Sequence, residues 1–209
     1  MRSAPRSSAS PTWTETLSTV SGTGRTSGAW RGEPHGPDLR WTDPAGWHLT
    51  LAFLGWVDAS VADDLLARLV APAAVTEPVT LAAAGLGALP SPRRARVLWY
   101  GLTDASGAAS ALAQAIRGTL APLVPRVDEG SPFRPHITLA RARTERGTDM
   151  SAWLAGRAVP KGAVPLERVI LYRSHLGRGL AQYEPLGAVT VGTGAQIVQD
   201  GRAEASFHG

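Results

Sequence analysis

Short runs of alternating hydrophobic and polar residues recur between about residue 39 and residue 191, and turn-forming residues separate them. Such runs predict half-buried β-strands. Two runs, at residues 61–70 and 106–123, instead repeat their apolar positions every three or four residues, which predicts amphipathic helices with Ser60 and Ser106 as N-caps. The predicted strands are LRW, WHLTLAFLG, VTLAAAGLG, RVLWYGL, HITLARA, ERVILYRSHL and QYEPLGAVTV, and SAWLAGRA is a predicted short helix.

Residues 1–36 show neither period. They are rich in Ser, Thr, Gly, Pro and Arg and poor in aliphatic residues, a composition that predicts loop or disorder. They lack the apolar h-region of a secretory signal. A transit peptide and a misplaced gene start or shifted reading frame are the other hypotheses for this segment. The expected organisation is therefore a disordered segment 1–36, one folded domain 37–190 and a polar, frayed tail 191–209.

The pentapeptides HLTLA (48–52) and HITLA (136–140) are nearly identical. Each opens a similar predicted series of strand, helix and two further strands. This repetition indicates an internal duplication, in which two pseudo-repeated lobes each contribute the same short motif to a shared cleft.

The motif has a defined geometry on a strand, where side chains alternate between two faces. His48 and Thr50 are expected on one face, with Leu49, Leu51 and Phe53 on the opposite face. The second copy repeats this arrangement, with a histidine and a threonine turned away from the core.

Two such strands facing one another suit displacement at phosphorus. One histidine can take a proton from water while the other gives a proton to the leaving oxygen. The threonine hydroxyls can donate to the non-bridging oxygens. A single H-x-T motif is more often a half-buried polar pair, and a duplicated fold can retain both copies for packing alone.

Composition removes several alternatives. The chain has no cysteine, so it forms no disulfide, offers no thiolate nucleophile and contains no Cys-ligated zinc site. No run of eighteen apolar residues is present, so no membrane partner is expected. The net charge is +4 and the basic residues are almost all arginine, which suits phosphate. No histidine–carboxylate cluster has metal-ligand spacing, so neither a metal nor another cofactor is expected. We expect a cytoplasmic monomer.

Several stretches around the two motifs resemble the 2H phosphoesterase superfamily, which is named for two H-x-T-x motifs. Within it they most resemble the bacterial and archaeal RNA 2′,3′-cyclic phosphodiesterases, first called 2′-5′ RNA ligases. These stretches span about residues 39–187, most of the chain. They are RWTDPAGWHLTLAFLG, RVLWYGL, FRPHITLARAR, VILYRSHLGRG and QYEPL.

The resemblance implies an α+β fold of two lobes, with antiparallel sheets lining a central groove and helices on the outer faces. It also implies metal-independent hydrolysis of 2′,3′-cyclic phosphates, on RNA ends or in cyclic nucleotides, to 2′-phosphates. In that pattern His48 is the proton donor to the leaving O3′ and His136 is the proton acceptor that activates water, with Thr50 and Thr138 beside them. Some members also join or cleave 2′-5′ linkages, so ligation is a secondary expectation.

Three further residues are candidates for substrate binding. Arg141 follows the second motif, as arginine often does in the family, and Arg134 lies two residues before His136. Trp99 and Tyr100 are adjacent on a predicted strand, so only one of them can face the groove and stack on a base; Tyr100 is the predicted contact. Solvated salt bridges and core packing are the structural alternatives for these residues.

The N-terminal segment departs from the family. Members usually begin with an apolar strand and a long helix, whereas residues 3–24 fit neither. A missing strand would disturb the alignment of the groove, so an RNA-end binder without turnover is the main alternative function. A zinc hydrolase using the two histidines is a third possibility, which the absence of a further ligand disfavours.

Overall fold

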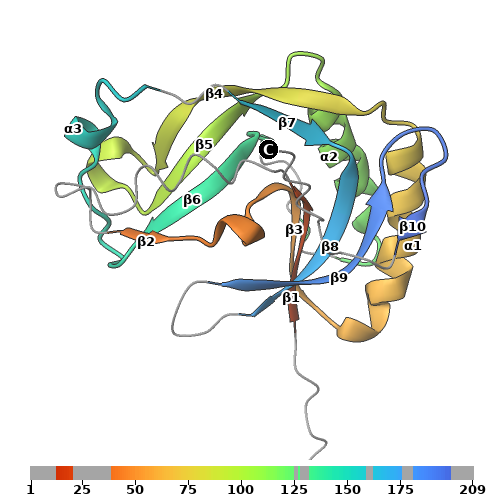
Figure 1. The fold of residues 1–209 in the computed structure, drawn as a ribbon. Coiled ribbons are helices and arrows are strands. Elements are labelled where there is room, and N and C mark those ends of the chain that lie inside the picture. The colour runs from red at the N-terminus through yellow and green to blue at the C-terminus, as the bar shows by residue number, and fades with distance from the viewer. Residues whose placement is uncertain are drawn as a thin grey trace, which may run out of the picture.

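The computed structural model describes residues 13–20, 39–124, 127, 132–158, 162–175 and 181–198, which form an α+β fold around one curled sheet (Figure 1). All of its strand pairings are antiparallel. The predicted fold class is confirmed. The strands are β1 (Trp13–Val20), β2 (Leu39–Trp41), β3 (His48–Val57), β4 (Val79–Leu89), β5 (Val97–Thr103), β6 (His136–Ala142), β7 (Ala163–Leu166), β8 (Arg168–His175), β9 (Gln182–Thr190) and β10 (Ile197–Val198). The α-helices are α1 (Ala62–Ala74), α2 (Ala108–Leu120) and α3 (Ser151–Leu154).

The two histidine strands, β3 and β6, meet in the middle of the sheet. The strand order is β10-β9-β8-β1-β3-β6-β5-β4-β7, and β2 pairs with β6 beside this path. β3 and β6 join through the pair Leu49–Ile137. We call β10-β9-β8-β1-β3 the His48 half and β6-β5-β4-β7 with β2 the His136 half.

Each half takes strands from both sequence repeats. β8 and β9 follow His136 in the chain yet lie in the His48 half, and β4 and β5 follow His48 yet lie in the His136 half. The expected pair of lobes is therefore built from interleaved segments rather than from two consecutive parts of the chain. Long-range strand pairing decides this exchange, and the linear repeat does not predict it.

Both long helices cover the His48 half, because α1 packs against α2, β8 and β9 while α2 packs against β3 (Figure 1). Their capping differs from the prediction. The backbone N–H of Ser60 donates to the Asp58 side chain (2.9 Å), which caps a 3₁₀ turn ahead of α1. At α2, the Asp104 carboxylate accepts from the backbone N–H of Ser110 (2.8 Å). Ser106 makes only a longer contact of 3.3 Å with the following backbone.

The expectation of loop or disorder fails for residues 13–20. They form β1, which pairs with β3 on one side and with β8 on the other. This segment, WTETLSTV, lacks an aliphatic run, but Trp, Thr and Val favour extended backbone. The sheet has therefore not lost this strand. The remainder of the predicted segment 1–36 lies outside the described residues, so the proposed domain boundary there stays a prediction.

Part of the predicted C-terminal tail is also ordered. β10 pairs with the end of β9, and the Gly192 N–H donates to the carbonyl of Ala73 in α1 (3.0 Å). Residues 199–209 lie outside the described part of the chain. At the opposite edge of the sheet, β7 was not predicted. Pro165 lies in it, and prolines in sheets are largely confined to such edge strands.

Aliphatic side chains from the helices and the sheet form the main core. Fully buried members include Leu65 of α1, Ile116 of α2 and Leu81 of β4. Within the described ranges, no helix is long and apolar enough to cross a membrane.

Candidate active site

The two histidine strands contain a bulge at the same position of the motif. On β3 the register with β1 steps from Thr50 directly to Ala52, so Leu51 has no partner on β1. On β6 the register with β5 skips Leu139 in the same way. A bulge places two residues of one strand opposite one of its neighbour and shifts the alternation of side chains beyond it.

The bulges change which residues share a face with the histidines. Simple alternation predicts Phe53 in the core, but it is 51% exposed. This prediction is wrong because the bulge at Leu51 reverses the alternation after Ala52. Arg141 occupies the equivalent place on β6 and is likewise exposed. The bulge therefore places Arg141 on the histidine side of β6, whereas simple alternation would place it on the core side.

The predicted catalytic side chains gather around the pair that joins the two halves. Leu49 and Ile137 lie directly opposite each other and are fully buried, so the residues on either side of them turn to the other face of the sheet. We call this surface the histidine face. The predicted residues on it are His48, Thr50, His136 and Thr138.

Backbone carbonyls fix the tautomer of both histidines. His48 Nδ1 lies 2.8 Å from the carbonyl oxygen of Gly46, and His136 Nδ1 lies 2.7 Å from that of Arg134. A carbonyl oxygen can only accept, so each Nδ1 must carry its hydrogen and donate. In the neutral ring Nε2 then holds the free lone pair. Both Nε2 atoms are therefore the ones able to exchange protons with a substrate.

A chain of hydrogen bonds ties the start of β3 to β6. The indole Nε1 of Trp47, a residue only 1% exposed, donates to Thr42 Oγ1 (2.7 Å). Thr42 Oγ1 in turn contacts the carbonyl oxygens of Leu139 (2.8 Å) and Thr138 (3.0 Å). Because Trp47 immediately precedes His48, this chain sets the position of one histidine strand relative to the other.

His48 is enclosed by two tyrosines of the His48 half. Its ring centroid lies 4.5 Å from that of Tyr183 on β9 and 5.7 Å from that of Tyr172 on β8. Burial lowers the pKa of His48 below its usual value, and the positive charges of Arg141 and His136 lower it further, against the opposing effect of the backbone hydrogen bond. Burial also raises the pKa of Tyr172 to about 12, so this phenol stays protonated near neutral pH.

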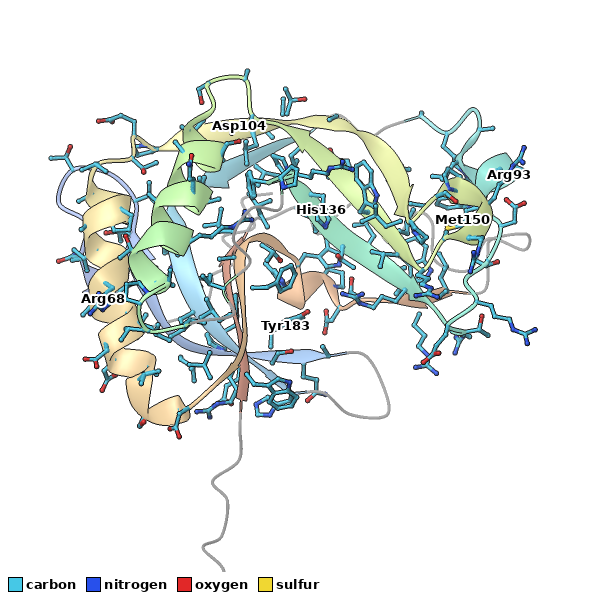
Figure 2. The ribbon with its side chains drawn as sticks, turned by 180° about the vertical axis from the view of Figure 1, so that it is seen from behind. Arg68, Arg93, Asp104, His136, Met150 and Tyr183 are labelled. Atoms are coloured by element: carbon cyan, nitrogen blue, oxygen red, sulfur yellow. The ribbon has the colours of Figure 1, made fainter. Side chains whose placement is uncertain are left out.

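His136 and Tyr183 belong to different halves of the sheet, and Figure 2 labels both. The pair Leu49–Ile137 brings the starts of β3 and β6 together, and the positive charges of Arg141 and His136 contribute to the lowered pKa of His48. Arg134, by contrast, is exposed ahead of β6, and its carbonyl orients His136. Its predicted contact with substrate stays a prediction.

The aromatic pair on β5 is arranged in the opposite way to the prediction. Tyr100 is opposite Ile137 and only 3% exposed, so it belongs to the core side of the sheet. Trp99 is opposite Thr138 and therefore lies on the histidine face, with its ring centroid 6.1 Å from that of His136. The aromatic side chain available to a ligand on β5 is Trp99.

Several residues of the site have no clear signal in the sequence. Thr42 and Trp47 lie in the turn segment TDPAGW, whose turn character is predictable but whose hydrogen bonds to β6 are not. Tyr172 and Tyr183 reach His48 only through the exchange of strands between repeats. Among the described side chains, no group of three or more histidines and carboxylates could hold a metal ion.

Comparison with known proteins identifies relatives of this chain. The family model described as "2′-5′ RNA ligase superfamily" matches residues 27–178. An RNA 2′,3′-cyclic phosphodiesterase of Geobacillus stearothermophilus is 28% identical over 152 residues, which cover 73% of this chain and 48% of that relative. The chain thus matches about half the length of this protein. An RNA 2′,3′-cyclic phosphodiesterase of Aeropyrum pernix is 28% identical over 166 residues, 78% of this chain and 92% of its own.

Solved structures agree with the fold. Apo Escherichia coli LigT aligns with a TM-score of 0.63 and 28% identity over 87% of this chain and 98% of its own. LigT complexed with phosphate aligns with a TM-score of 0.61 and 26% identity over 88% of this chain and 99% of its own. The family match covers most of the chain, including both histidine strands, and the chain therefore belongs to the 2′-5′ RNA ligase superfamily.

Proposed function

We propose that the protein hydrolyses 2′,3′-cyclic phosphates, at RNA 3′ ends or in cyclic nucleotides, to 2′-phosphates. The observation that carries this proposal is the gathering of His48, Thr50, His136 and Thr138 on one face around a single strand pair, with both Nε2 atoms free of the backbone. The named activity of the curated relatives and the phosphate bound by LigT support it.

The chemistry follows from these groups. Water attacks phosphorus, a new P–O bond forms and the P–O3′ bond breaks, with the attacking and leaving oxygens roughly in line. His136 Nε2 takes the proton from the attacking water, while His48 Nε2–H gives a proton to the departing O3′. Thr50 and Thr138 donate hydroxyl hydrogens to the non-bridging oxygens. Arg141 lies on the same face and adds a positive charge near the phosphate.

The assignment of His48 as the donor sets a condition on its pKa. In the free protein burial and nearby positive charges lower this pKa, which favours the neutral ring and thus a base. A bound phosphate brings negative charge beside His48 and raises its pKa, as any close opposite charge does. The donor role therefore requires protonation of His48 in the substrate complex. The lowered pKa alone favours the reverse order, with His48 as the base.

The proposal needs no metal or other cofactor, because the two imidazoles supply both proton transfers and the threonines and Arg141 hold the phosphate. Turnover should therefore be unaffected by a chelator, whereas a zinc hydrolase would lose activity. A cytoplasmic monomer and a secondary 2′-5′ ligase reaction stay predictions.

Phosphorus NMR of an oligonucleotide ending in a 2′,3′-cyclic phosphate, with excess chelator, tests the proposal. We expect a 2′-phosphate product with the wild type and with His175→Ala, a matched control whose histidine pairs with Glu184 (2.7 Å) away from the histidine face. His48→Ala and His136→Ala should leave the cyclic phosphate intact. A folded wild-type protein that binds the oligonucleotide without opening it is an RNA-end binder, and a 3′-phosphate product contradicts the proposed regiochemistry.

A further inference from the structure

The histidine face continues across β5 and β4 as two rows of small residues and one tryptophan. Directly opposite residues of antiparallel strands share a face. The first row runs from His136 through Gly101 to Gly85. The second row runs from Thr138 through Trp99 to Gly87. Trp99 is therefore the large side chain of the second row. The residue next to it on β4 is Gly87, and the β5 and β4 residues of the first row are Gly101 and Gly85.

The ring of Trp99 occupies the space that side chains at two of these glycines would fill. A Cβ atom at Gly87 would lie 2.1 Å from Cζ2 of the tryptophan, and one at Gly101 would lie 2.5 Å from Cζ3. Both distances are far below van der Waals contact. The six-membered ring thus lies across the sheet, with one face against backbone and the other directed away from it. Residues larger than glycine at either position would lift the ring.

Hydrogen bonding does not explain this position. The indole Nε1 of Trp99 is buried and, among the described residues, has no hydrogen-bond partner. A buried donor without a partner destabilises the folded state, so its position in a native protein calls for an explanation. Trp99 is nevertheless partly exposed as a residue, and its ring centroid lies 6.1 Å from that of His136.

We propose that Trp99, seated on Gly87 and Gly101, is a stacking platform for the base of the nucleotide whose phosphate lies at His136 and Thr138. The inference rests on the proposed function and adds a determinant of substrate affinity to it. A base is attached one ribose away from its 2′,3′-phosphate, and the ring centroid of Trp99 lies 6.1 Å from that of His136. Stacking on an aromatic ring is available to every base, so the platform favours nucleotides without selecting a sequence.

The test compares two ligands that differ only in the base: adenosine 2′-monophosphate and 1-O-methylribose 2-phosphate. Calorimetric titration of the wild type should show that the base strengthens binding by about 10- to 100-fold. Trp99→Leu should abolish this difference and leave the affinity for the baseless phosphate unchanged. Trp56→Leu is the matched control, because Trp56 is an exposed tryptophan of β3 outside both rows (58% exposed).

Gly87→Ala provides a second variant that keeps Trp99 but displaces its ring, and it should also reduce the base-dependent difference. Gly118→Ala in α2, where no atom lies within 4 Å of the added Cβ, is its control. An equal affinity of the wild type for the two ligands, or an undiminished difference in Trp99→Leu, overturns the inference. Base-dependent binding without turnover of any cyclic phosphate instead contradicts the proposed hydrolysis and leaves the platform standing.

Discussion

His48 and His136 begin from the same local geometry and end in different surroundings. Each opens a strand, donates from Nδ1 to a carbonyl two residues earlier, and precedes a bulge three residues later. In the His48 half, Tyr172 and Tyr183 enclose the ring, and burial lowers its pKa. In the His136 half, Trp99 approaches from the side at 6.1 Å.

The same contrast continues beyond the bulge, where Phe53 follows one motif and Arg141 the other. The local motif thus determines the tautomer and direction of each imidazole, because the nearby backbone supplies the hydrogen-bond acceptor. The lowered pKa of His48 depends in addition on burial by side chains of other strands and on the positive charges of Arg141 and His136. In the proposed reaction, the two copies of the motif take opposite roles in proton transfer.

The unpaired residues of the two bulges also find different partners. The carbonyl of Leu51 accepts from Arg117 Nε of α2 (3.2 Å), whereas that of Leu139 accepts from the backbone N–H of Thr42 (2.9 Å) and from its hydroxyl (2.8 Å). A helix thus anchors the bulge of the His48 half, and the turn after β2 anchors that of the His136 half.

The largest expected effect separates the roles of the two histidines. His48→Ala and His136→Ala should each lower kcat on a 2′,3′-cyclic phosphate by about 10²- to 10⁴-fold. A p-nitrophenyl phosphodiester has a leaving group that needs no proton. On that substrate the rate of His48→Ala should approach the wild-type rate, whereas the rate of His136→Ala should stay low. Steady-state kinetics of the four combinations measure this, and recovery by His136→Ala instead would reverse the two roles.

Removal of a threonine hydroxyl should lower activity less than removal of a histidine, and by a similar factor in the two halves. Thr50→Val and Thr138→Val keep the shape of the side chain and remove one donor to a charged phosphate, so each should lower kcat/KM by about 10- to 100-fold. The double variant shows whether both donors act on the same phosphate. An unchanged kcat/KM in either single variant would exclude that hydroxyl from phosphate binding.

Thr42 and Arg117, which donate to the bulge carbonyls, should contribute to the stability of the folded protein. Removing a donor from a buried carbonyl costs about 1–3 kcal/mol, so Thr42→Val and Arg117→Met should both lower the free energy of unfolding in urea. We expect the larger loss for Thr42→Val, because its hydroxyl also accepts from Trp47. Thr80→Val, an exposed position on β4, is the control. A larger loss for Arg117→Met would show that α2 stabilises the sheet more than the turn does.

The smallest effect concerns the protonation of His48. Its NMR titration midpoint in the free protein should lie below 6.5, and Arg141→Gln should move it upward because a nearby positive charge is lost. Bound phosphate should raise it as well. The sign for stability follows. As the pH falls below 6.5, His48 is protonated more readily in the unfolded chain than in the folded chain. The contribution of His48 to the free energy of unfolding therefore decreases as the pH falls. A midpoint at or above 6.5 in the free protein would contradict the burial of His48 beside Tyr172 and Tyr183.

Much of the molecule could be predicted from the sequence, because its strands and helices follow local periods. The α+β class was implied by the family resemblance, whereas the two histidine strands and the approximate bounds of α1 and α2 come from such patterns. So does the pairing of His48 with Thr50 and of His136 with Thr138 on common faces. Alternation along a strand depends only on neighbouring residues, and these predictions needed no knowledge of the rest of the chain.

Other features depend on contacts between distant segments. The bulges exposed Phe53 and placed Arg141 beside the histidines, and the register of β5 with β6 placed Trp99 rather than Tyr100 on the histidine face. β1 formed in a segment without an aliphatic run, because two neighbouring strands offer it backbone partners. The sequence by itself therefore determined which residues are candidates for the proposed chemistry. Only the tertiary structure decided which of them meet, because strand register and strand exchange are set by pairing across the whole sheet.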